Sequence, residues 1–218
     1  EKIRHIINKG IEEEHLFKSI SMGINAGVKN YRLYIMVGLP NEDENDIKAI
    51  VDMTICLKQY MEKLGSKGTL TLSINPFIAK PCTPFQWSAM ADLKQTEKYF
   101  KYIKSELKKY KNIEVQFEST KESFIQGILA RGDRKISQVI YEAHLNGGSK
   151  AFKRALKTFK INADDYLYRN FDKEELLPWH RSDMGFTKDY LWKELQTALQ
   201  EKHTIQCFDG CKRCGVCK

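Results

Sequence analysis

The sequence predicts an α/β fold with parallel strands and helical crossovers, followed by a mostly helical C-terminal region and a cysteine-rich tail. Three observations predict this fold. Helical and strand patterns alternate between residues 12 and 117, only helical patterns follow residue 119, and four cysteines crowd the segment between Cys207 and Cys217. Such alternation favours a parallel sheet. A helix between two strands returns the chain, by a right-handed crossover, to the end of the sheet where the first strand began, so the second strand runs in the same direction.

The first elements of this pattern are a helix, a strand and a second helix. The first helix is expected at about residues 12–26, with glutamates in its first turn and Gly27 after its end. Tyr31–Val37 is nearly all apolar, which predicts a strand buried on both faces. Gly38-Leu39-Pro40 ends that strand, and a cluster of acidic residues begins a long helix that Gly65 closes.

Two further strands complete the predicted sheet. Leu70, Leu72 and Ile74 alternate with polar residues and lead into Asn75-Pro76-Phe77. A lysine-rich amphipathic helix follows over residues 92–111, and the alternation over residues 113–117 predicts a more exposed strand nearer a sheet edge.

The remainder of the chain is expected to be helical, beginning with a capping box from Ser119 to Glu122. Three regions are therefore predicted, with a soft boundary near residue 119. The three regions are residues 1–119, 120–202 and 203–218. The predicted helices of the second region lie at about residues 121–130, 134–145, 149–160 and 187–201.

Composition restricts the class of protein. The chain has 218 residues, of which 42% are hydrophobic, and this content excludes gross disorder. It contains no apolar run of membrane-spanning length and begins with charged, helix-like sequence, so we expect a soluble, cytoplasmic protein without a membrane partner. The net charge of +8 is concentrated on the lysine faces of amphipathic helices, which is typical of solvated surfaces, although a nucleic-acid-binding face is an alternative.

The cysteine-rich tail predicts a metal site. Cys207, Cys211, Cys214 and Cys217 have the spacing C-x3-C-x2-C-x2-C, with Gly210 and Gly215 between them to permit tight turns. Four thiolates suit tetrahedral zinc and an iron–sulfur cluster equally well. A redox-labile tail without metal is the alternative.

A second candidate site lies where the strands are expected to end. Gly38 follows one buried strand and Asn75-Pro76-Phe77 follows the next. Ligands of α/β proteins bind at the carboxyl ends of parallel strands, where a glycine lets a cofactor approach the backbone. A purely structural role for Gly38 is the alternative.

These segments resemble a known superfamily. Gly38-Leu39-Pro40-Asn41-Glu42 and Asn75-Pro76-Phe77, followed by Lys80-Pro81-Cys82-Thr83-Pro84-Phe85-Gln86-Trp87, look like the later strands of a radical S-adenosylmethionine (SAM) barrel. The opening Arg4-His5-Ile6-Ile7-Asn8-Lys9-Gly10 resembles the stretch after the preceding barrel strand. Ala130-Arg131-Gly132-Asp133-Arg134, Leu177-Pro178-Trp179 and the terminal Cys-Gly-Val-Cys are similar to an uncharacterised family of radical SAM proteins with a cobalamin-binding domain.

The resemblance implies the C-terminal half of a partial (βα) TIM-type barrel, inactive alone, within a longer radical SAM iron–sulfur oxidoreductase. That enzyme would cleave SAM at a 4Fe-4S cluster to generate a radical. Its catalytic cysteines and any cobalamin domain would lie in an N-terminal half that this sequence lacks, so the terminal cysteines would hold an auxiliary iron–sulfur cluster or zinc. By the resemblance, the residues that line the adenosyl group are Val37, Gly38, Leu39, Asn75, Pro76 and Phe77, with Lys9 near the SAM carboxylate.

The alternative function comes from a different class. A zinc-knuckle module could use its basic helices to bind RNA or ribosomal components, and RNA is also a possible substrate class for the enzyme. Other polar candidates favour structural roles, namely His180 and Asp183 in a tryptophan-packed loop and Cys82 among prolines.

Overall fold

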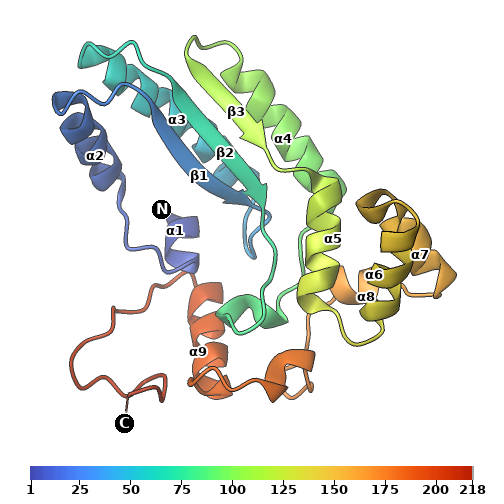
Figure 1. The fold of residues 1–218 in the computed structure, drawn as a ribbon. Coiled ribbons are helices and arrows are strands. Elements are labelled where there is room, and N and C mark those ends of the chain that lie inside the picture. Colours follow the sequence, from blue (N-terminus) through green and yellow to red (C-terminus); the bar gives the residue numbers. More distant parts are fainter. Residues whose placement is uncertain (218) are drawn as a thin grey trace.

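The structure is a computed structural model that describes residues 1–217, and it confirms the predicted α/β class (Figure 1). Its single described sheet has three parallel strands in the order β1-β2-β3. The strands are β1 (Tyr31–Val37), β2 (Leu70–Pro76) and β3 (Ile113–Phe117). The helices are α1 (Lys2–Ile6), α2 (Glu13–Asn25), α3 (Glu44–Lys63), η1 (Pro84–Trp87), α4 (Leu93–Leu107), α5 (Thr120–Arg131), α6 (Ile136–Leu145), η2 (Gly148–Ala151), α7 (Phe152–Thr158), α8 (Asp164–Leu167), η3 (Pro178–Arg181) and α9 (Lys188–Leu199).

Helices cover one face of this sheet. Leu33 of β1, Leu72 of β2 and Val115 of β3 lie side by side in the register and point into a core shared with α2, α3 and α4. The crossovers α3 and α4 therefore lie on the same side of the sheet as α2 (Figure 1). Burial of this apolar stripe is the main force that holds the sheet to its helices.

The opposite face of β1 is open, so the prediction that this strand is buried on both faces was wrong. Burial alternates along β1, and the side chains of Arg32, Tyr34 and Met36 are exposed. Tyr34 is 76% exposed. Tyrosine and methionine resemble core residues in a hydropathy pattern, but here they occupy the outward positions of a half-buried edge strand.

The central strand is β2, and it is more deeply buried than β1 and β3. Leu70, Leu72 and Ile74 are fully buried, and Thr71 is 8% exposed. The polar side chains on this open face interact across it, since Arg32 of β1 donates a hydrogen bond to Gln116 of β3 at 3.1 Å. The predicted edge position of β3 is confirmed.

Helix starts follow local hydrogen bonding. Asp43 caps α3 by accepting from the amides of Asn45 and Asp46, and Asp92 caps α4 in the same way. The capping box predicted at Ser119 was wrong, because the Ser119 side chain makes no capping hydrogen bond. The helix predicted over residues 92–111 ends at Leu107, and the one predicted over residues 149–160 divides into η2 and α7.

The helices after β3 share a second core, formed by α5, α6, α7 and α8 together with Met90. Arg131 joins this core to neighbouring loops. Its guanidinium donates to the carbonyl oxygens of Ser88 and Arg169, both at 2.6 Å, and lies 3.9 Å from the centroid of the Phe171 ring. Within the described residues, no helix has both the length and the apolar character needed to cross a bilayer.

Candidate functional site

The two strand ends singled out by the sequence lie together. The carbonyl oxygen of Val37, at the end of β1, accepts a hydrogen bond of 2.7 Å from the amide of Phe77, just after β2. Leu39, Phe77 and Ala79 are buried in a small apolar cluster with residues of α1. The parallel register thus forms one rim from two segments that are almost forty residues apart in sequence.

Gly38 has a conformation that requires glycine. Its φ is +93°, and an added Cβ would lie 3.0 Å from the Cβ of Ala91. The Gly38 and Leu39 amides donate hydrogen bonds to the carboxylate of Glu42. Burial raises the pKa of Glu42 to about 7, although these hydrogen bonds favour the ionised form.

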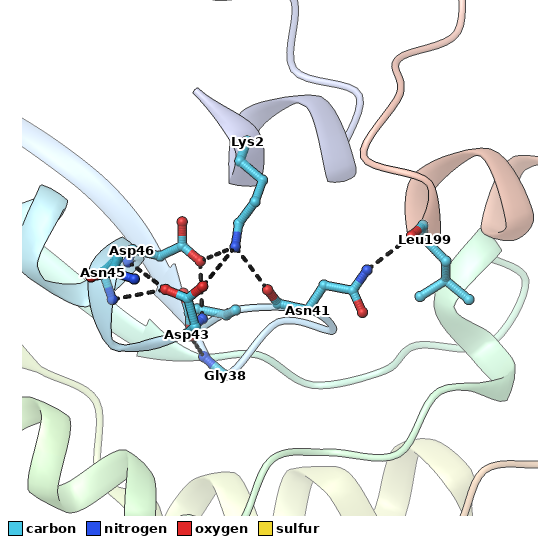
Figure 2. Close-up of polar contacts among 8 residues, drawn as sticks. Lys2, Gly38, Asn41, Asp43, Asn45, Asp46 and Leu199 are labelled. Atoms are coloured by element: carbon cyan, nitrogen blue, oxygen red, sulfur yellow. Dashed lines mark hydrogen bonds and ion pairs between the residues drawn. The ribbon is translucent and has the colours of Figure 1, made fainter.

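The loop after β1 is held between helices α1 and α9 (Figure 2). Lys2 of α1 donates to the carbonyl oxygen of Asn41 at 3.0 Å and forms an ion pair with Asp46 at 2.6 Å. The hydrogen bond to Asp46 raises the pKa of Lys2. The Asn41 side chain donates to the carbonyl oxygen of Leu199 in α9 at 2.9 Å. These contacts position the strand-end rim.

A cavity of about 310 Å³ adjoins this rim. Met36, Phe77 and Phe85 contribute apolar walls. Residues of helices α1 and α9 also line the cavity. This volume is at the lower end of the range for small-molecule sites, which are mostly apolar with a few polar groups. The cavity is therefore large enough for a small organic group. The polar side chains at its walls are His5, Asn8, Lys80, Thr83, Glu194, Lys202 and Thr204.

The predicted adenosyl-lining residues take different positions around this cavity. Phe77 lines it, whereas Val37 is fully buried and Leu39 is 5% exposed. At the C-terminal end of β2, Asn75 is half-buried and Pro76 is buried. Lys9 is exposed and lies outside the cavity lining, whereas its neighbour Asn8 contributes to it.

Sequence reasoning did not single out four charged or ionisable side chains of the cavity. His5 and Lys80 lie within residues 4–10 and 80–87, two of the motifs that carry the resemblance, so their place in the sequence could have identified them as candidates. Glu194 and Lys202 come from α9 and the segment after it, and nothing in their local sequence indicates that the fold returns them to the strand ends.

Arg213 organises the cysteine-rich tail. Its side chain donates to the Cys211 sulfur at 3.2 Å and to the carbonyl oxygens of Ile205 and Gln206 at 2.8 and 3.1 Å. Hydrogen bonds from the side chain and backbone of Arg213 lower the pKa of Cys211 to about 7. Interaction with Cys211 raises the pKa of the Cys207 thiol, so two of the four predicted ligands lie close together.

The other two thiols lie nearby. The carbonyl oxygen of Cys214 accepts from the Thr187 amide at 3.0 Å, which docks the tail on the start of α9. Among the described residues, no three cysteine sulfurs lie within 4.8 Å of one another. The soft donor set fits zinc or an iron–sulfur cluster, and binding would have to draw Cys214 and Cys217 towards the first pair. By its place in the sequence Lys218 would also offset the anionic thiolates, but it lies outside the described residues.

A second cavity, of about 430 Å³, contains Cys82, His180 and Asp183. Burial raises the pKa of the Cys82 thiol, which opposes the thiolate form that a nucleophile requires. The His180 Nδ1 accepts from the Leu177 amide at 3.2 Å, so this imidazole closes a turn. These features favour the structural roles expected for all three residues.

One mixed group near the N-terminal end of the described chain has metal-ligand geometry. Single ligand atoms of Glu1, His5 and Glu12 lie within 4.8 Å of one another. The His5 Nε2 is 3.5 Å from a carboxylate oxygen of Glu12, and the two acids are exposed. Exposed acidic groups are common without a metal, so this group alone does not indicate a metal site.

Comparison with known proteins gives one informative similarity. The chain is 34% identical over 173 residues, 79% of its length, to an uncharacterized protein of Methanocaldococcus jannaschii. It spans only 36% of that protein's length. No protein-family model and no solved structure matches the chain.

Proposed function

We propose that this chain is the C-terminal part of a radical SAM iron–sulfur enzyme and supplies the last strands of its (βα) barrel. The observation that carries the proposal is the one-sided sheet. Helices α2, α3 and α4 share a core with one face, while the other face presents exposed Arg32, Tyr34 and Met36.

This asymmetry favours a barrel over a doubly wound fold. Doubly wound sheets carry helices on both faces, whereas a (βα) barrel carries them on the outside only. Its inner face is then covered by the remaining strands. The polar side chains Arg32, Ser73 and Gln116 would line the interior of that barrel.

The strand-end cavity would hold the adenosyl part of SAM. Apolar walls from Met36, Phe77 and Phe85 suit the adenine ring. Bound SAM and a catalytic iron–sulfur cluster would together supply a radical for oxidation of the substrate. The residues of this chain would bind and orient the cofactor and exclude water from it.

The partner of this region would be the N-terminal half of the same protein. It would provide the earlier strands, the C-x3-C-x2-C loop for the 4Fe-4S cluster, and any cobalamin-binding domain. In the proposed protein, Cys207, Cys211, Cys214 and Cys217 hold an auxiliary cluster, because they follow all of the strands in sequence. The isolated chain should not cleave SAM.

Metal analysis after anaerobic expression tests the cysteine assignment. We expect iron and sulfide with broad visible absorption, and we expect Cys211→Ser to lose both. Cys56→Ser is the matched control, because Cys56 is an exposed thiol on α3, away from the tail sequence. Stoichiometric zinc without sulfide would instead support the zinc-knuckle alternative.

Calorimetric titration of the longer parent protein with SAM tests the barrel assignment. Met36→Trp should narrow the cavity and weaken binding by about tenfold or more, since Met36 lines it. Tyr34→Trp is the control, because Tyr34 lies on the same open face but outside the cavity lining. Equal affinities of the two variants would contradict the proposed position of SAM.

A further inference from the structure

We infer that the α6–α7 surface binds single-stranded nucleic acid through its phosphates and bases. The first observation is the distribution of charge. Residues 134–160 contain seven basic side chains and one carboxylate, Glu142, which gives this segment a net charge of +6 against +8 for the whole chain. The basic residues are Arg134, Lys135, Lys150, Lys153, Arg154, Lys157 and Lys160.

These charges are exposed and lack acidic partners. All seven basic residues are exposed, and none of them forms an ion pair within the described part of the chain. Lys153 and Lys157 are one turn apart on α7, where like charges repel and weaken a helix. A polyanion would relieve this repulsion.

The lysine-rich helix α4 provides a contrast. Residues 92–111 also contain seven basic side chains, but Asp92, Glu97 and Glu106 accompany them. Lys109 forms an ion pair with Glu106 at 2.8 Å. Residues 92–111 therefore keep a net charge of +4 against +6 for residues 134–160, so the larger excess of positive charge lies on the α6–α7 surface.

Exposed aromatic and apolar side chains accompany the basic residues. Tyr141 and Leu145, one turn apart on α6, are 67% and 62% exposed, and Phe159 lies between Lys157 and Lys160 in sequence. The helices α6 and α7 pack against each other and project from the side of the molecule opposite the C-terminal tail (Figure 1). Cations and exposed rings in one segment of the chain are a combination that binds single strands, because phosphates pair with the cations and unstacked bases stack on the rings.

This inference does not depend on the radical SAM proposal, because it uses neither the strand-end cavity nor the cysteines. It can be tested by fluorescence anisotropy of the full chain with a labelled single-stranded RNA oligonucleotide at several salt concentrations. The variant Lys150→Glu, Arg154→Glu, Lys157→Glu should bind at least about tenfold more weakly. The slope of log affinity against log salt should fall by about 2, because each phosphate contact on a single strand contributes about 0.7.

The matched control is Lys98→Glu, Lys101→Glu, Lys104→Glu on α4, which makes the same change in charge at three exposed positions. It should weaken binding much less. Tyr141→Ala should weaken binding at least about fivefold without changing the salt slope, whereas Tyr102→Ala on α4 should have little effect. Circular dichroism would confirm that each variant is folded, and Cys211→Ser should retain binding.

Several results would overturn the inference. Equal losses from the α7 and α4 triple variants would indicate nonspecific attraction by net charge. Equal affinity for an RNA duplex would contradict base stacking. Absence of RNA binding at low salt, or binding to anionic phospholipid vesicles in preference to RNA, would exclude nucleic acid as the partner of this surface.

Discussion

At the scale of single residues, the buried guanidinium of Arg131 joins segments that are far apart in the sequence. Arg131 is 1% exposed, and its hydrogen bonds to the carbonyl oxygens of Ser88, Leu167 and Arg169 connect α5 to the loop after η1, to the end of α8 and to the loop after α8. Burial lowers its pKa to about 10, which leaves it charged at neutral pH. A buried charge without a carboxylate partner depends on such carbonyl groups.

Arg131→Met should therefore lower the free energy of unfolding by about 2–5 kcal/mol, because it leaves buried carbonyl oxygens without donors. Urea denaturation would measure this loss. Arg134→Met is the control, since Arg134 is exposed and three residues away. Similar stabilities for the two variants would contradict the structural role of Arg131.

Glu42 should make stability depend on pH. Its pKa is raised from 4.5 to about 7 in the folded protein, so between these values the native state holds a proton that the unfolded chain has released. Stability should fall as pH rises through this range, by at most about 3 kcal/mol. Glu42→Gln should remove this contribution. The check is the difference between wild-type and variant unfolding free energies at pH 5 and pH 7.5, and a constant difference would contradict it.

The sequence contained only part of this information. The motif around Arg131 marked the segment, but only the fold shows that the carbonyl groups it binds come from residues 88 and 167–169. Glu42 was recognised as an acid at a helix start, a position that normally lowers its pKa. The raised pKa arises from burial, which a local pattern does not contain.

At the scale of elements, the turn after β1 can be tested through glycine. Gly38 and Gly27 have similar φ values, +93° and +88°, but an added Cβ would contact Ala91 only at Gly38. Gly38→Ala should therefore destabilise the protein by about 1 kcal/mol more than Gly27→Ala, because both variants share the conformational cost. Thermal unfolding would compare them, and equal melting temperatures would contradict the close approach of Gly38 to Ala91.

The bounds of the strands could be predicted well, but their burial could not. β1 has the predicted range Tyr31–Val37, and β3 has the predicted edge position. Burial of β1 was overestimated because Tyr34 and Met36 look like core residues in a pattern. β2 is more deeply buried than its alternation of apolar and polar residues indicates, because it lies between two other strands, and such pairing is nonlocal.

At the scale of the whole molecule, β1 has an open face and, within the described residues, an unpaired edge, and both are where earlier strands of a barrel would pack and pair in the parent protein. The amide of Tyr31 donates to the Thr69 carbonyl oxygen next to β2, so the amides of Arg32, Tyr34 and Met36 point away from β2. No other described strand pairs with this edge. If earlier strands of a barrel pair there in the parent protein, the same amides must become hydrogen-bonded.

Hydrogen exchange measured by NMR can follow this change. In the isolated chain, we expect the amides of Arg32, Tyr34 and Met36 to exchange at least about a hundredfold faster than those of Leu33 and Ile35, which face β2. In the longer parent protein, the two sets should become similarly protected, while the Leu33 and Ile35 amides serve as internal controls. Persistence of the fast set in the parent would mean that no strand adds to β1, and the barrel assignment would then be wrong.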